Sequence, residues 1–284
     1  MEIFARILAA VTRKFHPRGT QRILRALFNP EKFRFKGTIR YGDGLLVNID
    51  TSSYVEWDIF FRGQYEKKVI DIFKKFIKEG FVAIDAGAYI GTHTLPMAKL
   101  AGEKGRVLAF EPHPDIRGKL ADNIGLNGFN NIKVFGSALS DKEGKTNLFS
   151  YSDRMLDKGT SSLYELNNLE KSFEVQVSTL DKLAAEEKLS RLDLVKIDTR
   201  GSDFPIIKGA AESIKKFKPA VIFEYNRDNW NEAGFNWSNA KSFFDGVGYV
   251  LYLIGDNNLT PIKEEPTIRT SHNILAVPNG QKRP

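Results

Sequence analysis

The stretch FVAIDAGAYIGTHTL, residues 81–95, decides the fold. An apolar run ends at Asp85, a turn of small residues with Gly87 and Gly91 follows, and a helix is expected from about residue 92. In doubly wound sheets, ligands bind beyond the carboxyl ends of the strands. The glycines let backbone approach a ligand closely, and the first turn of a helix offers unpaired N–H groups. The stretch therefore predicts a binding site at a strand end.

Strand-like apolar segments alternate with helical segments through the rest of the chain. The strand-like segments are VAIDAGA, RVLAFEP, NIKVFGSAL, LDLVKID, AVIFEY, YVLYLIG and NILAVP. Several are apolar at consecutive positions, which is the pattern of strands covered on both faces. We expect helices at about 92–101, 114–127, 204–217 and 238–247. This alternation predicts an α/β fold with a parallel, doubly wound sheet and right-handed crossovers.

Residues 1–62 are expected to form an N-terminal helical and β extension, and residues 63–284 the main domain. The first thirty residues show the spacing of two short amphipathic helices that are rich in arginine. Such helices dock on the main domain or on a second copy, or contact a membrane surface or a partner. Extended segments around GDG suggest a small β-meander, and a helix follows that Gly80 ends.

An insertion interrupts the main domain at about residues 145–180. Two extended segments, KTNLFSY and SFEVQVSTL, flank a polar loop from Ser152 to Lys171. A loop this long inside a compact domain is more often functional than idle. Its hydroxyl groups, together with Arg154 and Lys158, make it our candidate for binding a substrate.

The composition excludes several classes of protein. The 284 residues include no cysteine, so disulfide frameworks, thiolate zinc sites and cysteine nucleophiles are absent. A net charge of +7 and a pI of about 9.3 suit an anionic partner without identifying one. No apolar run approaches the roughly 20 residues of a membrane span. Because Glu2 and Arg6 also break the pattern of a signal peptide, we expect a cytoplasmic protein.

An acidic residue at a second strand end points to a nucleoside. Glu111 lies in FEP, 26 residues after Asp85, where a carboxylate can accept both hydroxyls of a ribose. The spacing of Gly87 and Gly91 departs from the G-x-G-x-x-G of dinucleotide sites, and Asp85 would repel a pyrophosphate. A carboxylate tolerates the sulfonium and ammonium groups of S-adenosylmethionine. Charge therefore favours S-adenosylmethionine over NAD.

The chain resembles the FkbM family of S-adenosylmethionine-dependent methyltransferases over about residues 45–230. The similarity lies in FVAIDAGAYIGTHTLPMAKLAGEKGRVLAFEPHP, SALSD, DLVKIDTRGSDFPIIKGA and KPAVIFEYN, and GQYE is similar to a motif upstream in that family. The resemblance implies a class I, Rossmann-like methyltransferase fold. Its sheet has seven strands in the order 3-2-1-4-5-7-6, with the seventh antiparallel, and YVLYLIG and NILAVP fit the closing pair.

The resemblance also implies roles for individual residues. The methionine end of the cofactor is expected beside Asp85, the ribose at Glu111, the adenine near residues 137–139, and the transferred methyl near Asp198. Thr94 is expected to cap the helix beside the cofactor. The full set of expected cofactor-binding residues is Asp85, Gly87, Ala88, Tyr89, Gly91, Thr94, Glu111, Pro112, His113, Ser137, Ala138, Leu139 and Asp198.

Three positions depart from the family pattern. The family usually has asparagine where Tyr89 stands, an acidic residue where Arg200 stands, and glutamate where Asp203 stands. The first change reshapes a corner of the cofactor pocket. The second reverses a charge beside the expected reaction centre, which affects the choice of acceptor more than the binding of cofactor.

Methyl transfer is an in-line displacement at the sulfonium carbon, so positioning should supply most of the rate. A hydroxyl acceptor also needs a general base, for which Asp198, Glu224 and His113 are the candidates, with His93 as a fourth. The sequence singles out no metal-binding residues. We expect an O-methyltransferase acting on a sugar, a glycan or a natural product. The alternatives are an RNA methyltransferase, although no RNA-binding module is visible, and a cofactor-binding scaffold with little catalysis.

Overall fold

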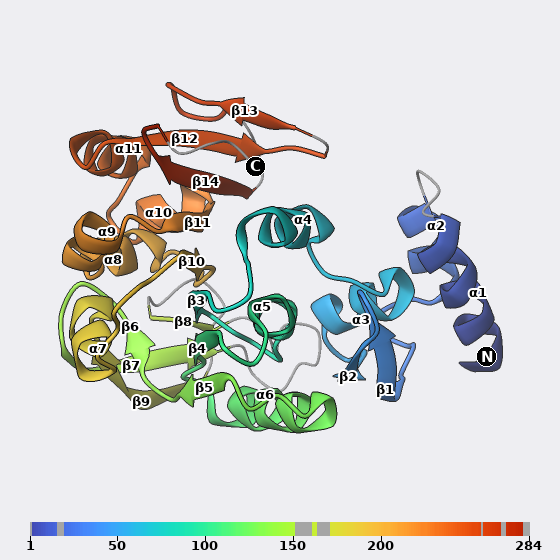
Figure 1. Cartoon of the computed structure of the whole chain (residues 1–284). Coiled ribbons are helices and arrows are strands. Elements are labelled where there is room, and N and C mark those ends of the chain that lie inside the picture. Colours follow the sequence, from blue (N-terminus) through green and yellow to red (C-terminus); the bar gives the residue numbers. More distant parts are fainter. Residues whose placement is uncertain are drawn as a thin grey trace.

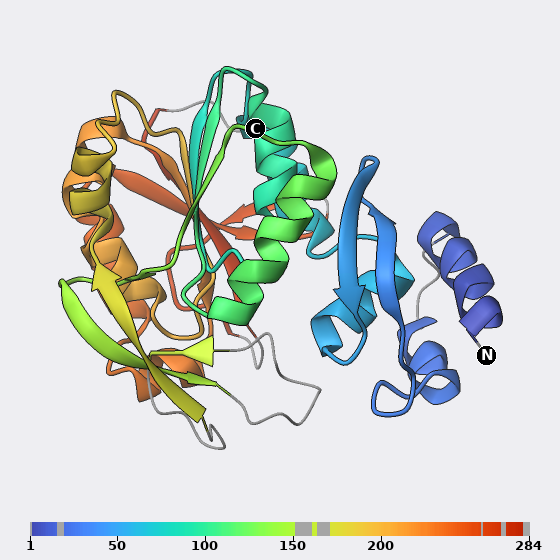
Figure 2. The same cartoon turned by 90° about the horizontal axis from the view of Figure 1, so that it is seen from below.

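The computed structural model describes residues 2–15, 20–150, 161–163, 171–256, 258–267 and 271–280. A central sheet covered by helices on both faces forms the main body, and the N-terminal extension lies to one side of it (Figures 1 and 2). Within these residues no helix is both long and apolar enough to cross a membrane.

The central sheet has the strand order predicted from the family resemblance. Its order is β5-β4-β3-β10-β11-β14-β12-β13, in which β14 pairs antiparallel with both β11 and β12. Numbered by position in the fold, the first seven strands read 3-2-1-4-5-7-6, and β13 adds an eighth, short edge strand. The strands are β3 (Val82–Ala86), β4 (Arg106–Phe110), β5 (Ile132–Phe135), β10 (Leu194–Ile197), β11 (Ala220–Tyr225), β12 (Tyr249–Ile254), β13 (Leu259–Pro261) and β14 (His272–Pro278).

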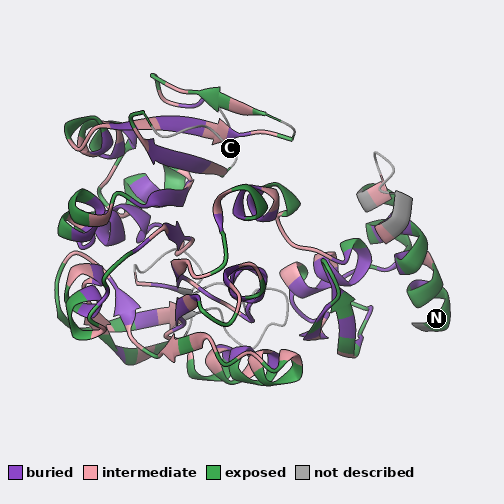
Figure 3. Ribbon diagram, in the orientation of Figure 1, coloured by how far each residue is buried: buried purple, intermediate pink, exposed green. Residues whose placement is uncertain are grey.

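Helices cover both faces of this sheet, as consecutive apolar residues in the strands predicted. One face packs against α4 (Lys67–Phe76), α5 (Thr94–Ala101) and α6 (Pro114–Asn127). The other packs against α7 (Leu180–Glu186), α8 (Asp203–Lys208), α9 (Ala211–Phe217), α10 (Arg227–Glu232) and α11 (Trp237–Gly246). The strands between them are largely buried (Figure 3).

The helix expected at 204–217 is broken into α8 and α9. Gly209 lies at the break, where an added Cβ would stand 2.0 Å from the carbonyl oxygen of Ser140. The backbone therefore passes too close to its neighbour for a side chain at this position, and the helix restarts after it.

The insertion forms a small second sheet beside the main one. Its order is β6-β9-β7-β8, and the two extended segments predicted from the sequence pair antiparallel as β7 and β9. Its strands are β6 (Ala138–Leu139), β7 (Gly144–Ser150), β8 (Ser161–Ser162) and β9 (Lys171–Ser178). Most of the loop from Ser152 to Lys171, including Arg154 and Lys158, lies outside the described residues.

The extension contains the two predicted helices and, in place of a meander, one hairpin followed by a third helix. Its elements are α1 (Glu2–Phe15), α2 (Thr20–Leu27), β1 (Lys36–Tyr41), β2 (Leu45–Asp50) and α3 (Tyr54–Arg62). Helix α3 was not expected from the sequence, because YVEWDIFFR is apolar almost all round; Gly63 ends it in the left-handed conformation.

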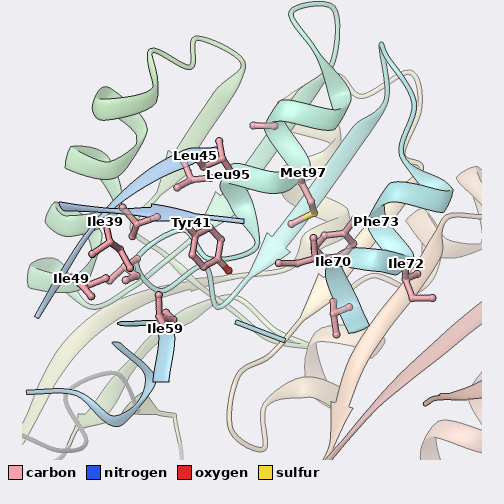
Figure 4. Close-up of a cluster of buried hydrophobic side chains, with 14 of the residues drawn as sticks. Ile39, Tyr41, Leu45, Ile49, Ile59, Ile70, Ile72, Phe73, Leu95 and Met97 are labelled. Atoms are coloured by element: carbon pink, nitrogen blue, oxygen red, sulfur yellow. The ribbon is translucent and has the colours of Figure 1, made fainter. Parts of the chain in front are cut away.

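The extension shares a hydrophobic core with the main domain. Ile39 and Ile59 of the extension lie in one buried cluster with Phe73 of α4 and Met97 of α5 (Figure 4). The Tyr41 hydroxyl donates a hydrogen bond to the Thr92 carbonyl, at 2.8 Å, and so ties the hairpin to the loop before α5. The side chains of Trp57, Trp230 and Trp237 are all buried in the core.

Candidate active site

A cavity of about 420 Å³ opens at the carboxyl ends of β3, β4, β10 and β11. Most of the predicted site residues lie around it. The predicted residues in its wall are Gly87, Tyr89, Glu111, Pro112, Ser137, Ala138, Leu139, Asp198 and Glu224. Parallel strands bring these positions together because their carboxyl ends meet at one edge of the sheet.

The turn after β3 requires glycine at its centre. Gly87 has φ +86°, and an added Cβ would lie 2.0 Å from the carbonyl oxygen of Asp198. The N–H groups of Gly87 and Ala88 both donate to the Phe110 carbonyl, each at 3.0 Å, which joins the ends of β3 and β4. The absence of a side chain thus lets two strand ends close on the cavity.

Glu111 is held in place by backbone. Its Oε2 accepts from the Tyr89 N–H at 2.9 Å, and its Oε1 accepts from the His113 N–H at 3.0 Å. Burial raises the pKa of Glu111 to about 7, and the two N–H groups oppose that rise. Each oxygen keeps a further lone pair for a ligand hydroxyl, so the predicted ribose contact is chemically available.

Three residues at the site adopt the left-handed backbone conformation without being glycine. They are Glu66 (φ 40°), Tyr89 (φ 51°) and Arg200 (φ 45°). Residues forced into this region cost on the order of 1–3 kcal/mol each and cluster at functional sites. Asparagine, which the family resemblance led us to expect at position 89, tolerates this conformation better than tyrosine does.

The Tyr89 side chain compensates by linking the cofactor turn to the extension. Its hydroxyl donates to Glu56 Oε1 at 2.7 Å and lies 3.0 Å from Ser53 Oγ. Lys119 also binds Glu56, at 3.1 Å. The Tyr89 side chain therefore makes a partly buried contact between the two parts of the chain.

Asp85 lies behind the cavity wall. It accepts a hydrogen bond from Thr94 Oγ1 at 2.6 Å, while its Oδ1 has no partner among the described residues. Burial raises the pKa of Asp85 to about 6. Thr94 therefore holds Asp85 and does not cap the helix as expected; His93 occupies the cap position, without a side-chain capping bond.

A buried lysine lies among the acids at this end of the cavity. Lys196, on the strand beside Asp85, is fully buried and donates to Asp198 Oδ2 at 3.0 Å. Burial alone would lower the pKa of Lys196, but Asp198, Glu66 and Asp85 together hold it above its usual range. Lys196 is thus a positive charge inside the site that sequence reasoning did not identify.

The two carboxylates proposed as bases both face the cavity, whereas the third candidate does not. Asp198 and Glu224 line the cavity, and burial, with Asp198 and Asp203 nearby, raises the pKa of Glu224 to about 8. His113 lies outside the lining, with its ring edge-on to Phe173 at 4.9 Å between centroids. His93 lines the cavity, and burial lowers its pKa well below the usual value, so its imidazole is neutral.

Three other predicted residues also lie outside the lining. Ala88 and Thr94 are buried behind the turn. Gly91 (φ +96°) leaves room for Leu95 and Leu120, since an added Cβ would meet both within 3.2 Å. Its lack of a side chain therefore serves the packing of Leu95 and Leu120, and the predicted close approach of Gly91 to a ligand stays a prediction.

Asp203 fixes the loop that carries Arg200. Its carboxylate accepts from the Thr199 and Gly201 N–H groups, at 3.3 and 3.2 Å. Burial raises the pKa of Asp203 to about 7. Arg200, in the cavity wall, therefore belongs to a loop whose backbone is held by the Asp203 carboxylate.

Several lining residues were not predicted because they come from distant parts of the chain. They include Val55, Tyr65, Leu148, Leu163, Thr199, Ser202, Asn229 and Ser271. The similarity of GQYE to a family motif was the one sequence signal for Tyr65. The hydroxyls of Thr199 and Ser202 are buried without a partner among the described residues.

These residues fit S-adenosylmethionine. The acids around the methionine end outnumber the cations there, which suits a ligand with a sulfonium and an ammonium group, and buried Asp85 Oδ1 lacks a partner among the described residues. Glu111 would hold the ribose, Ser137 to Leu139 with Phe110 would flank the adenine, and Gly87 would admit the methionine chain.

A 3-2-1-4-5-7-6 sheet with this acidic cavity at its carboxyl edge defines a class I methyltransferase. The sequence profile of the Methyltransferase FkbM domain matches residues 85–251, more than half of the chain. The protein therefore belongs to the FkbM methyltransferase family, and its cofactor is S-adenosylmethionine.

Similar proteins include enzymes of bacteria and fungi. AMB antimetabolite synthetase AmbE of Pseudomonas aeruginosa is 24% identical over 222 residues. The match covers 66% of this chain but only 10% of AmbE. Methyltransferase 1 of Beauveria bassiana is 24% identical over 75% of this chain and 89% of its own length. The solved structure of methyltransferase FkbM from Methylobacillus flagellatus has 12% identity and a TM-score of 0.44, covering 90% of this chain and 59% of its own.

Proposed function

We propose that this enzyme transfers the methyl group of S-adenosylmethionine to a hydroxyl group of a sugar, a glycan or another natural product. The observation that carries the proposal is the chemistry of the cavity wall opposite the cofactor turn. That wall combines the carboxylate of Glu224 with the hydroxyls of Thr199 and Ser202, which have no hydrogen-bond partner in the described part of the chain. Hydroxyl groups and a carboxylate are suitable partners for a neutral, hydroxyl-bearing acceptor.

The reaction needs one proton transfer besides the displacement. The acceptor oxygen forms a bond to the methyl carbon as the carbon–sulfur bond breaks, and the sulfonium becomes a neutral thioether. The hydroxyl proton passes to a base, for which Glu224 is suited because its pKa, about 8, lies near working pH. Positive charge on the bound cofactor lowers that pKa and favours the ionised form.

Two features disfavour RNA as the acceptor. The cavity wall carries Glu111, Asp198 and Glu224, which repel a phosphodiester backbone. The exposed basic residues of α2, Arg22 and Arg25, lie in the extension and not in the cavity wall. The name of AmbE, an antimetabolite synthetase, supports a natural-product acceptor.

The test measures conversion of S-adenosylmethionine to S-adenosylhomocysteine with a panel of sugars, glycan extracts, natural products and RNA as acceptors. Mass spectrometry then gives the mass of each product. A hydroxyl acceptor should gain the mass of one methylene unit. Glu224→Gln should lower turnover by about 100-fold or more, while cofactor affinity stays within about threefold. Tight cofactor binding without turnover on any acceptor would instead favour a scaffold, and methylated RNA would refute the proposal.

A further inference from the structure

We propose that Glu66, His93 and Asp198 bind a divalent transition metal ion beside the cofactor. One ligand atom from each of the three residues lies within 4.8 Å of the others. Two carboxylates and one imidazole are a donor set that Zn²⁺ and Mn²⁺ both accept. The sequence singled out His93, Asp198 and the GQYE motif that ends in Glu66, but did not bring them together, because they stand before α4, before α5 and after β10.

Two of the three ligand atoms are unsatisfied. His93 Nε2 and Glu66 Oε2 are buried, 3.4 Å apart, and neither makes a hydrogen bond within the described part of the chain. The His93 side chain is only 5% exposed. Buried polar atoms without partners are rare in native proteins and call for an explanation, of which a missing ion is one.

The surrounding contacts orient these atoms. Asn273 Nδ2 donates to Glu66 Oε1 at 2.6 Å, which leaves Oε2 directed at His93. The imidazole lies between the rings of Tyr65 and Phe73, with centroids 5.7 and 5.6 Å away. Partners that fix the orientation of metal ligands are a regular feature of metal sites. The strained backbone of Glu66, at φ 40°, is consistent with a position held for function.

The local charge also leaves room for a cation. Glu66, Asp85 and Asp198 act on a single buried ammonium, that of Lys196. Lys196 occupies Asp198 Oδ2, so Oδ1 remains for a metal. Three carboxylates and one lysine leave two negative charges, which one divalent ion neutralises.

The inference deepens the proposed function and rests on it for its catalytic meaning. A metal ion beside the transferred methyl would bind the acceptor hydroxyl and lower its pKa, so that Glu224 could remove the proton more easily. The binding of the ion itself can be measured without cofactor or acceptor.

The experiment is calorimetric titration of the cofactor-free protein with Zn²⁺ and with Mn²⁺, together with the absorption spectrum of the Co²⁺ form. We expect one ion per chain. His93→Gln and Glu66→Gln should each weaken binding by at least about 100-fold, because loss of an outer partner alone costs 10- to 100-fold. His113→Gln, which changes a histidine outside the cluster, is the matched control, and melting temperatures check that every variant folds.

Absence of binding to the wild-type protein, or binding that survives His93→Gln, refutes the metal site. A second outcome also refutes the metal site. If the wild-type protein binds no metal and Glu66→Gln loses affinity for S-adenosylmethionine, the cluster binds the ammonium group of the cofactor. If metal binds as expected but no hydroxyl acceptor is methylated, the metal site stands and the proposed acceptor class fails.

We also propose, from independent observations, that the N-terminal extension docks on an anionic membrane surface. Helix α1 buries its small residues, Ala5, Ala9 and Thr12, against the rest of the protein. Large apolar side chains on α1 and α2 instead face solvent. Their exposed fractions are Ile3 76%, Phe4 58%, Ile7 59%, Val11 46%, Ile23 61% and Leu27 54%.

Charge selects the occupant of this apolar face. Residues 1–28 contain six arginines and lysines and one glutamate, and Arg22 and Arg25 are exposed on α2. Two copies that met through this face would bring the exposed Arg22 and Arg25 of each copy together, whereas anionic lipid attracts these side chains. Apolar and basic residues together on short helices are the pattern of helices that lie in the membrane interface.

Flotation with phosphatidylcholine vesicles, with and without about one third phosphatidylglycerol, tests this proposal. We expect binding to the anionic vesicles only, weakened by salt, and at least tenfold weaker in the double variant Phe4→Ser, Ile7→Ser. Leu126→Ser, which removes an exposed leucine on α6, is the control. No binding, or a dimer in light scattering that Phe4→Ser, Ile7→Ser dissociates, refutes the membrane assignment.

Discussion

The two walls of the cavity differ in how the chain builds them. The wall expected to bind the cofactor, here called the cofactor wall, comes from one continuous part of the chain, between Ala86 and Leu139, and depends on backbone turns and one fixed carboxylate. The opposite wall combines residues from Val55 to Ser271 and depends on side chains. A short continuous motif can therefore form a pocket for a cofactor that stays the same. A pocket for a particular acceptor is formed by several separate loops, and each of these can change without the others.

The largest effect on cofactor affinity and stability should come from adding a side chain at the glycine in the turn of the cofactor wall. Gly87→Ala places a Cβ against the Asp198 carbonyl at a φ that alanine rarely adopts, so we expect cofactor affinity to fall by more than about 100-fold and stability by several kcal/mol. Gly118→Ala, within α6 and with no atoms near the new methyl, should be stabilising by up to about 1 kcal/mol. Calorimetry measures the cofactor affinity of each variant, and urea unfolding measures its stability. Equal affinities and equal stabilities of the two variants would show that Gly87 has no special role in the cofactor wall.

Glu111→Gln should weaken S-adenosylmethionine binding by about 10- to 100-fold, because hydrogen bonds to a charged group contribute roughly 1.5–3 kcal/mol. The amide cannot accept at both ends, so one of the Tyr89 and His113 N–H groups also loses its acceptor. Glu111→Ala should bind still more weakly while the fold persists. Normal affinity of either variant would show that Glu111 does not hold the ribose.

The stability of the cofactor-free enzyme should fall as pH rises from 6.5 to about 8.5. Burial raises the pKa of Glu111 to about 7 and that of Glu224 to about 8. Both acids hold protons more tightly in the folded state, so the stabilisation present at low pH is lost through this window. The histidines with lowered pKa values act in the opposite direction up to about pH 7.5, because their unfolded-state imidazoles titrate near 6.5, and they reduce this drop without reversing it. Thermal melting should show a drop of several degrees, smaller in Glu224→Gln; a melting temperature that rises with pH would contradict it.

The smallest effect should come from the contact that joins the extension to the cofactor turn. Tyr89→Phe removes the hydrogen bonds to Glu56 and Ser53 and should cost about 1 kcal/mol in urea unfolding. Cofactor affinity should stay within about threefold, because the Tyr89 N–H still donates to Glu111. A larger loss of affinity than of stability would mean that the phenol itself belongs to the cofactor wall.

Sequence reasoning placed the strands of the main sheet well and the N-terminal extension less well. The run VAIDA and the helix after it follow from apolar pattern and glycine position, both of which are local. Helix α3 was missed because its residues are apolar on nearly every side, so that no helical stripe stands out. The break at Gly209 depends on the approach of Ser140, about seventy residues away, which no local pattern contains.

The sequence by itself determined the sheet, the family and the carboxylate of Glu111, since each is encoded in neighbouring residues whose spacing has a direct physical meaning. Only the tertiary structure decided which side chains face one another across the cavity. It placed Glu66 against His93, buried Lys196 under Asp198 and turned the large apolar side chains of α1 outward. Glu66 and His93 are distant in the chain, and although Lys196 and Asp198 are near neighbours, the burial that gives both pairs their chemistry arises only when the chain is folded.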